Sequence, residues 1–247
     1  DWIADIKNYN LKYDFRYYAN EKLKLDFGVS GILYRLNPGE VKPTDPSSSI
    51  NYLKLEQKRA FESGLYISAE HKLTDKLTAQ YGLRYSRFSR LGGQNIMNYV
   101  DNQPVVYNSE LGIYEEGVES GETFYKKGES IETFDNFEPR LGLSYQLNES
   151  SSVKASYTKS SQYLHLLSNT SAVTPLDVWA PSGKYIKPQL SNQYAVGYYK
   201  NFKDNEYSLE LETYYKTVDN RIDYVDGSDL IGTNTIETEI LNGEARA

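Results

Sequence analysis

The sequence contains no cysteine and very little histidine or methionine. Its 247 residues include Cys 0, His 2 and Met 1. Disulfide scaffolds and cysteine-type zinc sites are therefore excluded, and a catalytic triad built on histidine has few residues to draw on. We accordingly predict no catalytic residue, no metal site and no cofactor, and we do not expect an enzyme.

The chain also lacks a long apolar run and an excess of basic residues. No stretch approaches the roughly 18 apolar residues of a membrane-spanning helix. Lys+Arg 27 against Asp+Glu 34 gives a formal net charge of -7, which argues against nucleic acid as a partner because phosphate binding needs a basic surface. The first residues carry no secretion-signal pattern, so we expect a removed leader or a segment cut from a longer protein.

What the sequence does have is apolar and polar residues in alternation. A period of two predicts strands with one apolar and one polar face, and short polar turns between successive stretches predict four hairpins. A ninth strand is expected to begin near Ile236, and the chain then stops where the pairing of that strand would develop. The eight alternating stretches are residues 9–17, 23–33, 61–73, 77–85, 141–147, 153–157, 194–202 and 207–215.

The connections between the predicted strands are short and long in turn. Short turns near Asn20, Asp75, Glu149 and Asp204 alternate with long segments at residues 36–51, 89–133 and 160–190. One end of the predicted sheet therefore carries short turns, and the other end carries long loops.

Two further features lie within or beside the long connections. Residues 101–132 are rich in glutamate, which predicts an exposed acidic loop. Pro139 is expected near the start of a strand, where its missing N–H donor costs least.

Strand length decides between a soluble sheet and a membrane barrel. Most of the alternating stretches reach about 9–11 residues, which suits a tilted strand that crosses a bilayer. Only a closed barrel satisfies every backbone group in lipid, and its polar face then lines a wet lumen. We therefore predict an all-β fold, an antiparallel transmembrane β-barrel with short periplasmic turns and long extracellular loops. Its interfacial aromatic residues are expected to be Tyr17, Tyr18, Tyr85, Phe88 and Tyr215.

Residues 136–145, with the sequence NFEPRLGLSY, resemble the strand of TonB-dependent outer-membrane receptors that carries an E-P-R element. Residues 64–68 and 81–86 look like the paired strands that precede it in that family. Residues 154–157, 162–169 and 177–179 look like its Bacteroidetes-type branch.

This resemblance implies that residues 1–247 are part of a larger, 22-stranded barrel. About eight strands are expected here, without the plug domain and without the ends of the barrel. In that family a TonB complex acts through the plug to admit a siderophore, cobalamin, a glycan or a similar scarce nutrient. The resemblance therefore implies an outer-membrane location, contact with outer-membrane lipid, and three further partners: the plug, the TonB complex and a small-molecule or glycan ligand. It does not identify the ligand.

The candidate ligand-binding residues lie in the long connections. Aromatic rings there can stack on sugars or planar chelates while keeping a polar group available, and a loop histidine can make a polar contact. The alternative is structural, with the rings packing the loops together and the histidine forming a hydrogen bond. The candidates are Tyr99, Tyr107, Tyr114, Tyr125, His165 and Trp179.

Two other functions are compatible with the same pattern. Eight strands can close into a small outer-membrane barrel that serves as an adhesin or a structural protein. The tyrosines could instead line the binding face of a soluble β-rich carbohydrate-binding module. The expected ninth strand argues against the first of these, and the long strands with loops at one end argue against the second.

Overall fold

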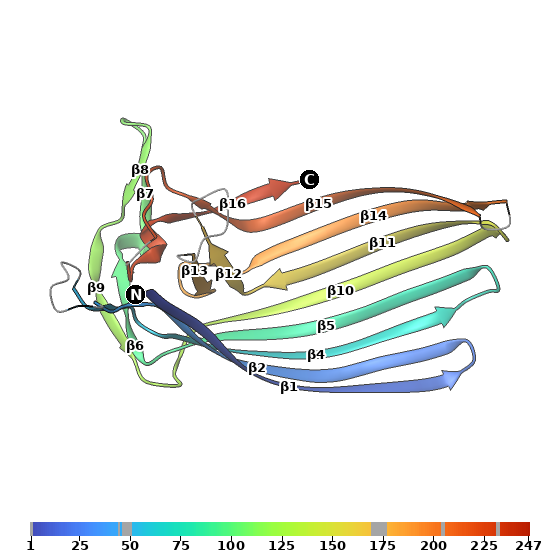
Figure 1. The fold of residues 1–247 in the computed structure, drawn as a ribbon, viewed down its shortest axis with the longest axis horizontal. Coiled ribbons are helices and arrows are strands. Elements are labelled where there is room, and N and C mark those ends of the chain that lie inside the picture. Colours follow the sequence, from blue (N-terminus) through green and yellow to red (C-terminus); the bar gives the residue numbers. More distant parts are fainter. Residues whose placement is uncertain (1, 44, 46–50, 169–176, 204–205, 231–232) are drawn as a thin grey trace.

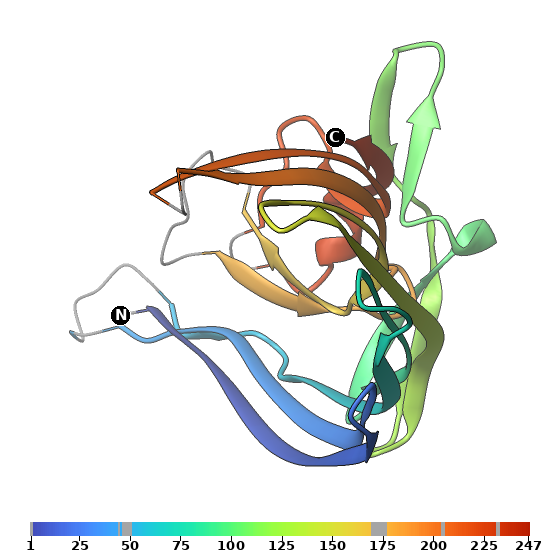
Figure 2. The same cartoon turned by 90° about the vertical axis from the view of Figure 1, so that its right-hand side faces the viewer.

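The chain folds as one large antiparallel sheet that curves around an open trough (Figures 1 and 2). The computed structural model describes residues 2–43, 45, 51–168, 177–203, 206–230 and 233–247. Asn169, in a segment that carries the family resemblance, and Asp204, in the fourth predicted turn, lie outside these residues. Within the described residues, no helix is long and apolar enough to cross a membrane.

Successive long strands are neighbours in the sheet. Its order is β1-β2-β4-β5-β10-β11-β14-β15-β16, with the short β3 paired to β2, and every pairing is antiparallel. This up-and-down order is typical of barrel walls. The strands are β1 (Trp2–Asn20), β2 (Leu23–Val41), β3 (Leu53–Lys54), β4 (Lys58–Lys72), β5 (Leu77–Leu91), β10 (Ser130–Asn148), β11 (Ser151–Gln162), β14 (Gln189–Phe202), β15 (Tyr207–Tyr224) and β16 (Ile240–Arg246).

The register places apolar side chains on one face and polar side chains on the other. Because side chains alternate along a strand, a row of paired residues projects to a single face. One row across eight strands consists of Tyr17, Leu25, Ala69, Tyr81, Leu141, Tyr157, Tyr194 and Tyr215. The adjacent row, on the opposite face, consists of Arg16, Asp26, Ser68, Gly82, Arg140, Thr158, Gln193 and Lys216.

The apolar face is the outer surface of the wall. Leu11, Ile67 and Leu211 are each more than half exposed there, at 63%, 54% and 58%. Large apolar side chains exposed over a whole sheet face are unfavourable in water, whereas lipid covers them. The sheet is thus built to cross a bilayer, as the alternation predicted.

All the short turns lie at one end of the sheet, and the long connections lie at the other (Figure 1). The loop end carries three small two-stranded sheets, which pair β6 (Gln94–Tyr99) with β9 (Glu119–Tyr125), β7 (Val105–Asn108) with β8 (Ile113–Glu116), and β12 (Leu164–Leu167) with β13 (Val178–Pro181). The β7–β8 hairpin projects away from the rest of the molecule, whereas β12 and β13 lie within the curve of the sheet (Figure 2). Two short 3-10 helices, η1 (Val100–Asn102) and η2 (Ile236–Thr238), complete the described elements.

The structure corrects the expected limits of several elements. The acidic segment 101–132 is exposed but is not a simple loop, because it contains β7, β8, β9 and the start of β10. The ninth strand begins at Ile240 and follows η2, which occupies the position near Ile236 where the strand was expected. A strand can contain consecutive glutamates such as Glu115 and Glu116 when both of its faces are in solvent. The glutamate-rich composition therefore did not distinguish a loop from an exposed hairpin.

Pro139 and Phe88 are also placed differently from the prediction. Pro139 lies inside β10, but the ladder between β10 and β11 runs only from Arg140 to Asn148. The missing N–H therefore falls where that ladder stops, which explains why a mid-strand proline is tolerated. Phe88 is fully buried on the inner face and packs with Tyr34 and Ala60, so it does not belong to an interfacial ring.

Candidate functional site

The inner face of the trough is a wide polar surface. A cavity of about 950 Å³ opens on it, lined by residues of β1, β2, β4, β5, β10 and β11. Its charged lining is mixed in sign, with five cationic residues and four carboxylates. They are Lys12, Arg16, Lys24, Arg84 and Arg140, with Asp14, Asp26, Glu70 and Glu138.

Neighbouring strands pair most of these charges. Arg16 Nε lies 2.6 Å from Asp26 Oδ1, and Lys24 Nζ lies 2.6 Å from Glu70 Oε2. Each pair joins residues that are directly opposite in the ladder, so the register itself creates the contact. The inner face of the sheet is therefore polar and nearly balanced in charge, which suits contact with water, a polar solute or a polar domain inside the barrel.

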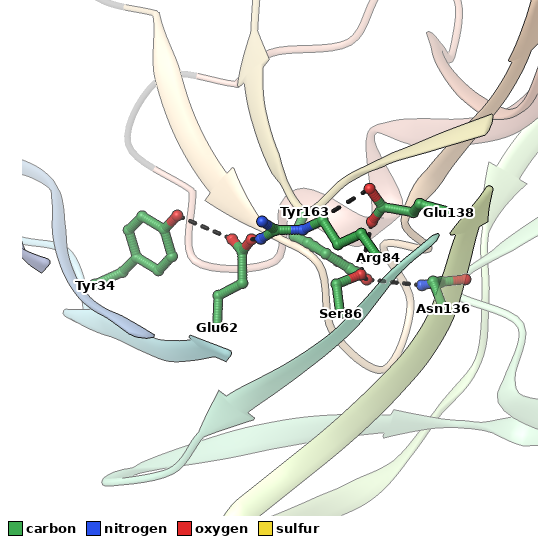
Figure 3. Close-up of polar contacts among 7 residues, drawn as sticks. All are labelled: Tyr34, Glu62, Arg84, Ser86, Asn136, Glu138 and Tyr163. Atoms are coloured by element: carbon green, nitrogen blue, oxygen red, sulfur yellow. Dashed lines mark hydrogen bonds and ion pairs between the residues drawn. The ribbon is translucent and has the colours of Figure 1, made fainter. Parts of the chain in front are cut away.

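A buried network crosses the wall at the level where β10 and β11 separate (Figure 3). Arg84 on β5 lies between two glutamates, with Nη2 3.4 Å from Glu62 Oε1 and Nε 3.9 Å from Glu138 Oε2. The hydroxyl of Tyr34 donates to Glu62 Oε2 at 3.0 Å. Glu138 is only 5% exposed, so Arg84 supplies the charge that this carboxylate needs.

The same network holds the chain that enters the lumen. Ser86 Oγ donates to Glu138 Oε1 at 2.7 Å and lies 2.7 Å from the Tyr163 hydroxyl. Asn136 Nδ2 donates to that hydroxyl at 2.8 Å, and the ring of Tyr163 stacks on Phe88 with centroids 4.7 Å apart. Tyr163 directly precedes β12, so the network fixes the point where the β12–β13 hairpin turns inward.

His165 is part of this inward hairpin and is 2% exposed. Its Nε2 lies 2.9 Å from Ser182 Oγ, and its Nδ1 has no hydrogen-bond partner among the described residues. Burial lowers the pKa of His165 to about 4, so the ring is neutral at physiological pH. The hydrogen bond between His165 and Ser182 links β12 to the residue that follows β13.

A second, smaller cavity of about 210 Å³ lies at the loop end, where β6 approaches the β13–β14 connection and η2. Lys58, Arg90 and Glu237 line it. Arg90 is 4% exposed and is held by two carbonyls, because its Nη1 donates to the oxygens of Arg59 and Leu91 at 2.7 and 2.9 Å. Burial raises the pKa of the Glu237 carboxyl.

Residues 184–185 attach β6 to the rest of the loop end. Lys184 Nζ donates to Asn98 Oδ1 at 2.8 Å, and the Tyr185 hydroxyl donates to the Met97 carbonyl at 3.0 Å. Sequence reasoning missed both residues, since neither lies in an alternating stretch. Their contacts with β6 join residues that are 86 and 88 positions apart in the sequence, so only the three-dimensional structure reveals them.

The six candidate residues do not form one site. Tyr107 and Tyr114 face each other on the projecting hairpin, with ring centroids 5.0 Å apart and exposed fractions of 55% and 44%. Tyr99 is 3% exposed and packs edge-on against Tyr185 at 5.3 Å.

The other three candidates lie on different elements. Trp179, on β13, is 39% exposed, whereas His165 on the partner strand β12 is buried. Tyr125 ends β9 and is half-buried beside Gln94. Within the described part of the chain, no group of three or more His, Asp or Glu side chains is arranged to hold a metal ion.

Comparison with known proteins identifies the family. The family model described as "TonB dependent receptor-like, beta-barrel" matches residues 1–247. A comparison with curated protein sequences gives no match.

Solved structures share the fold at low sequence identity. The copper transporter OprC superposes with a TM-score of 0.61 at 13% identity, covering 99% of this chain and 34% of that one. The hemophore receptor HasR of Serratia marcescens, solved with its hemophore HasA and heme, gives 0.59 at 15% identity, covering 99% and 38%. The FrpB iron transporter of Neisseria meningitidis gives 0.57 at 14% identity, covering 98% and 31%. The chain therefore spans about a third of the length of these structures.

These matches explain the architecture described above. A sheet with an apolar outer face, a polar inner face and loops at one end is a barrel wall of the bacterial outer membrane. Within the described residues β1 and β16 do not pair with each other, so the sheet is open rather than a small closed barrel. The Bacteroidetes-type assignment stays a prediction. The chain belongs to the TonB-dependent receptor family and forms a segment of its β-barrel.

Proposed function

We propose that this chain forms part of the wall and loop end of a transporter that takes up a scarce nutrient across the outer membrane. The single observation that carries the proposal is the two-faced sheet, whose inner face is polar and nearly balanced in charge while its outer face is apolar. A structural anchor would need only the outer face. A passage for polar solutes needs both.

The proposed partners follow from the family. A plug domain fills the trough, the TonB complex acts on that plug, and the ligand is a siderophore, cobalamin, a glycan or a similar small molecule. The charge pairs that cross the inner face support this assignment, since they leave the wall polar but without a strong field of one sign. No reaction is catalysed in this proposal.

The exposed loop aromatics are the residues we assign to ligand capture. The side chains of Tyr107, Tyr114 and Trp179 are exposed, and that of Tyr125 is partly covered. Tyr99 and His165 are assigned to the scaffold beneath them, because both are buried within the loop end.

A deletion strain tests the function directly. The strain is grown with haem, a ferric siderophore, cobalamin or an oligosaccharide as the limiting nutrient, and uptake of the labelled compound is measured. We expect uptake of one class to be lost, restored by the complete wild-type receptor, and abolished again when TonB is removed. Uptake that continues without TonB would contradict the mechanism.

The same assay tests the assigned residues. The double substitution Tyr107→Ala with Tyr114→Ala, and Trp179→Ala separately, should each lower uptake at equal surface expression. Tyr207→Ala is the matched control, because Tyr207 is an exposed aromatic residue at the opposite, short-turn end of the sheet. Equal uptake by all these variants would remove the loop aromatics from the ligand site.

A further inference from the structure

The cavity of about 210 Å³ at the loop end, which we call the loop-end cavity, is assembled from distant parts of the chain. The barrel wall contributes Lys58 from β4 and Arg90 from β5. Lys58 is two residues from Ala60, which pairs with Arg90, so the two cations are diagonal neighbours on the inner face. β6, the β13–β14 connection and the segment that leads into η2 contribute the rest of the lining.

Arg90 is held in place but keeps donors for a ligand. The backbone at Gly183 covers its side chain, since a Cβ on Gly183 would lie 3.5 Å from Arg90 Cγ. Nη1 donates to two main-chain carbonyls, and Nη2 donates to Gln94 Oε1 at 2.6 Å. A guanidinium has five N–H donors. These contacts leave Nε and one hydrogen of Nη2 without an acceptor among the described residues.

Neither of the two wall cations is neutralised by a direct ion pair. Among the described residues, no carboxylate forms an ion pair with Lys58 or Arg90. Glu237 on η2 lines the same cavity. Burial raises the pKa of the Glu237 carboxyl, although the charges of Lys58 and Arg90 act in the opposite direction. Glu237 is therefore close enough to feel both cations without being bound to either.

The charges around the cavity determine what it can hold. Lys58 and Arg90 together exceed the part-buried Glu237 by one positive charge. The other charged lining residues are Lys184, Glu56 and Glu122. Lys184 and Glu122 already bind asparagine side chains, and both Glu56 and Glu122 are exposed, where water screens their charge. A ligand group with a single negative charge therefore completes the balance inside the cavity.

Size and polarity narrow the ligand further. A pocket for a drug-sized ligand has a volume of about 300–1,000 Å³, so the loop-end cavity suits a smaller molecule. Because an ionised carboxylate only accepts hydrogen bonds, a ligand group beside Glu237 has to be a donor, such as a hydroxyl. The side-chain amides of Gln94, Asn95 and Asn234 also line the cavity and can bind further hydroxyls.

From these observations we propose that the loop-end cavity binds a small sugar acid, with its carboxylate between Lys58 and Arg90 and a hydroxyl donating to Glu237. Arg90 offers N–H donors to the carboxylate oxygens, and Lys58 offers a compact positive charge. Phosphate carries up to about two negative charges at neutral pH, so Glu237 repels it more strongly than it repels a carboxylate. The acid is either free or the terminal residue of an oligosaccharide.

The test uses the complete receptor, purified in detergent and titrated at pH 7 by isothermal titration calorimetry. The probes are glucuronate, a disaccharide that ends in glucuronate, glucose, acetate and inorganic phosphate. We expect at least one of the two glucuronate probes to bind about tenfold more tightly than glucose, acetate and phosphate. The tighter of the two identifies the source, the free acid or the end of a glycan.

Glucose separates the role of the carboxylate from that of the ring, and acetate separates the role of the hydroxyls. If any of glucose, acetate or phosphate bound as tightly as both glucuronate probes, the proposal would be overturned. Such a failure would leave the uptake proposal unaffected, because binding is measured here without transport.

Variants then locate the site. Lys58→Gln should weaken glucuronate binding about tenfold and leave glucose unchanged, because only the acid uses the ammonium group. Lys127→Gln is the matched control, since Lys127 is an exposed lysine of the loop end that does not line the cavity. An unchanged affinity in Lys58→Gln would place the acid elsewhere and contradict the proposal.

Glu237→Gln tests the third contact. The amide oxygen still accepts a hydroxyl, but the negative charge beside the cations is gone. Phosphate should then bind more tightly, so the preference for glucuronate over phosphate should shrink. A preference that stayed the same would remove Glu237 from the site.

Discussion

The hydroxyl of Ser86 lies 2.7 Å from both the carboxylate of Glu138 and the hydroxyl of Tyr163. Because the carboxylate can only accept, Ser86 donates to Glu138, and Tyr163 must then donate to Ser86. The Tyr163 oxygen in turn accepts from Asn136. In this series of hydrogen bonds every donor points towards Glu138, so each bond polarises the next in the same direction. The series ends at the Glu138 carboxylate, whose charge Arg84 neutralises.

Removing the Tyr163 hydroxyl should loosen the inward hairpin. Tyr163→Phe keeps the stack on Phe88 but deletes two hydrogen bonds at a buried site, at a cost of about 1–3 kcal/mol. Hydrogen exchange of the β12 and β13 amides in the complete receptor should speed up accordingly. Tyr145→Phe, on the exposed outer face, is the control and should leave these amides unchanged.

The two faces of β5 should respond differently to a new charge. Leu83→Arg places a cation on the lipid-facing surface and should destabilise the barrel by about 2–4 kcal/mol near the bilayer midplane. Gln80→Arg, on the same strand but in the polar cavity, should be far less costly. Equilibrium unfolding in lipid vesicles measures both, and equal costs would contradict the assigned faces.

Two glycines offer a matched test of packing in the wall. A Cβ on Gly28 would lie 2.4 Å from both the Tyr13 carbonyl oxygen and the Tyr66 hydroxyl, so Gly28→Ala requires the backbone to move. We expect a cost of about 1–3 kcal/mol and a lower thermal midpoint in detergent. At Gly142 the nearest atom is 3.7 Å from such a Cβ, so Gly142→Ala should be tolerated.

The inward hairpin should lose stability in acid because of His165. Its pKa of about 4 in the folded state is below the value of about 6.5 for an exposed histidine, so the unfolded hairpin binds the proton more tightly. The stabilisation is complete above pH 6.5 and is lost as the pH falls towards 4, by up to about 3 kcal/mol.

Hydrogen exchange of β12 and β13, corrected for the intrinsic effect of pH on exchange, measures this loss. His165→Gln should remove most of the difference between pH 7 and pH 4. An unchanged profile in the variant would assign the acid sensitivity to other groups.

Periodicity predicted the wall well and the loop end poorly. Each stretch of alternating residues lies in a strand. A strand with lipid on one face and water on the other requires apolar and polar residues to alternate, and this period of two is a distinctive pattern in the sequence. The loop end follows no such rule. Tyr185 contacts Met97, and Ser182 contacts His165. Both contacts depend on how segments distant in the sequence fold together, so a local sequence pattern does not predict them.

The candidate residues illustrate the same limit. The sequence does not distinguish Tyr99 from Tyr107, since both are aromatic residues in long connections and both are predicted to contact ligand. The structure separates the two, since one packs against Tyr185 and the other is exposed on a projecting hairpin. Exposure depends on which segments return to cover a side chain, and the order of residues alone does not specify that.

The early end of the β10–β11 ladder has a consequence for how the wall can move. Beyond Pro139 and Thr158 the two strands no longer share main-chain hydrogen bonds within the described residues, although β10 remains paired to β5 and β11 to β14. At this level side chains link β10 to the segment that follows β11, as in the hydrogen bond that Asn136 Nδ2 donates to the Tyr163 hydroxyl. The seam is therefore a place in the described wall where two neighbouring strands can move apart without breaking main-chain hydrogen bonds to each other.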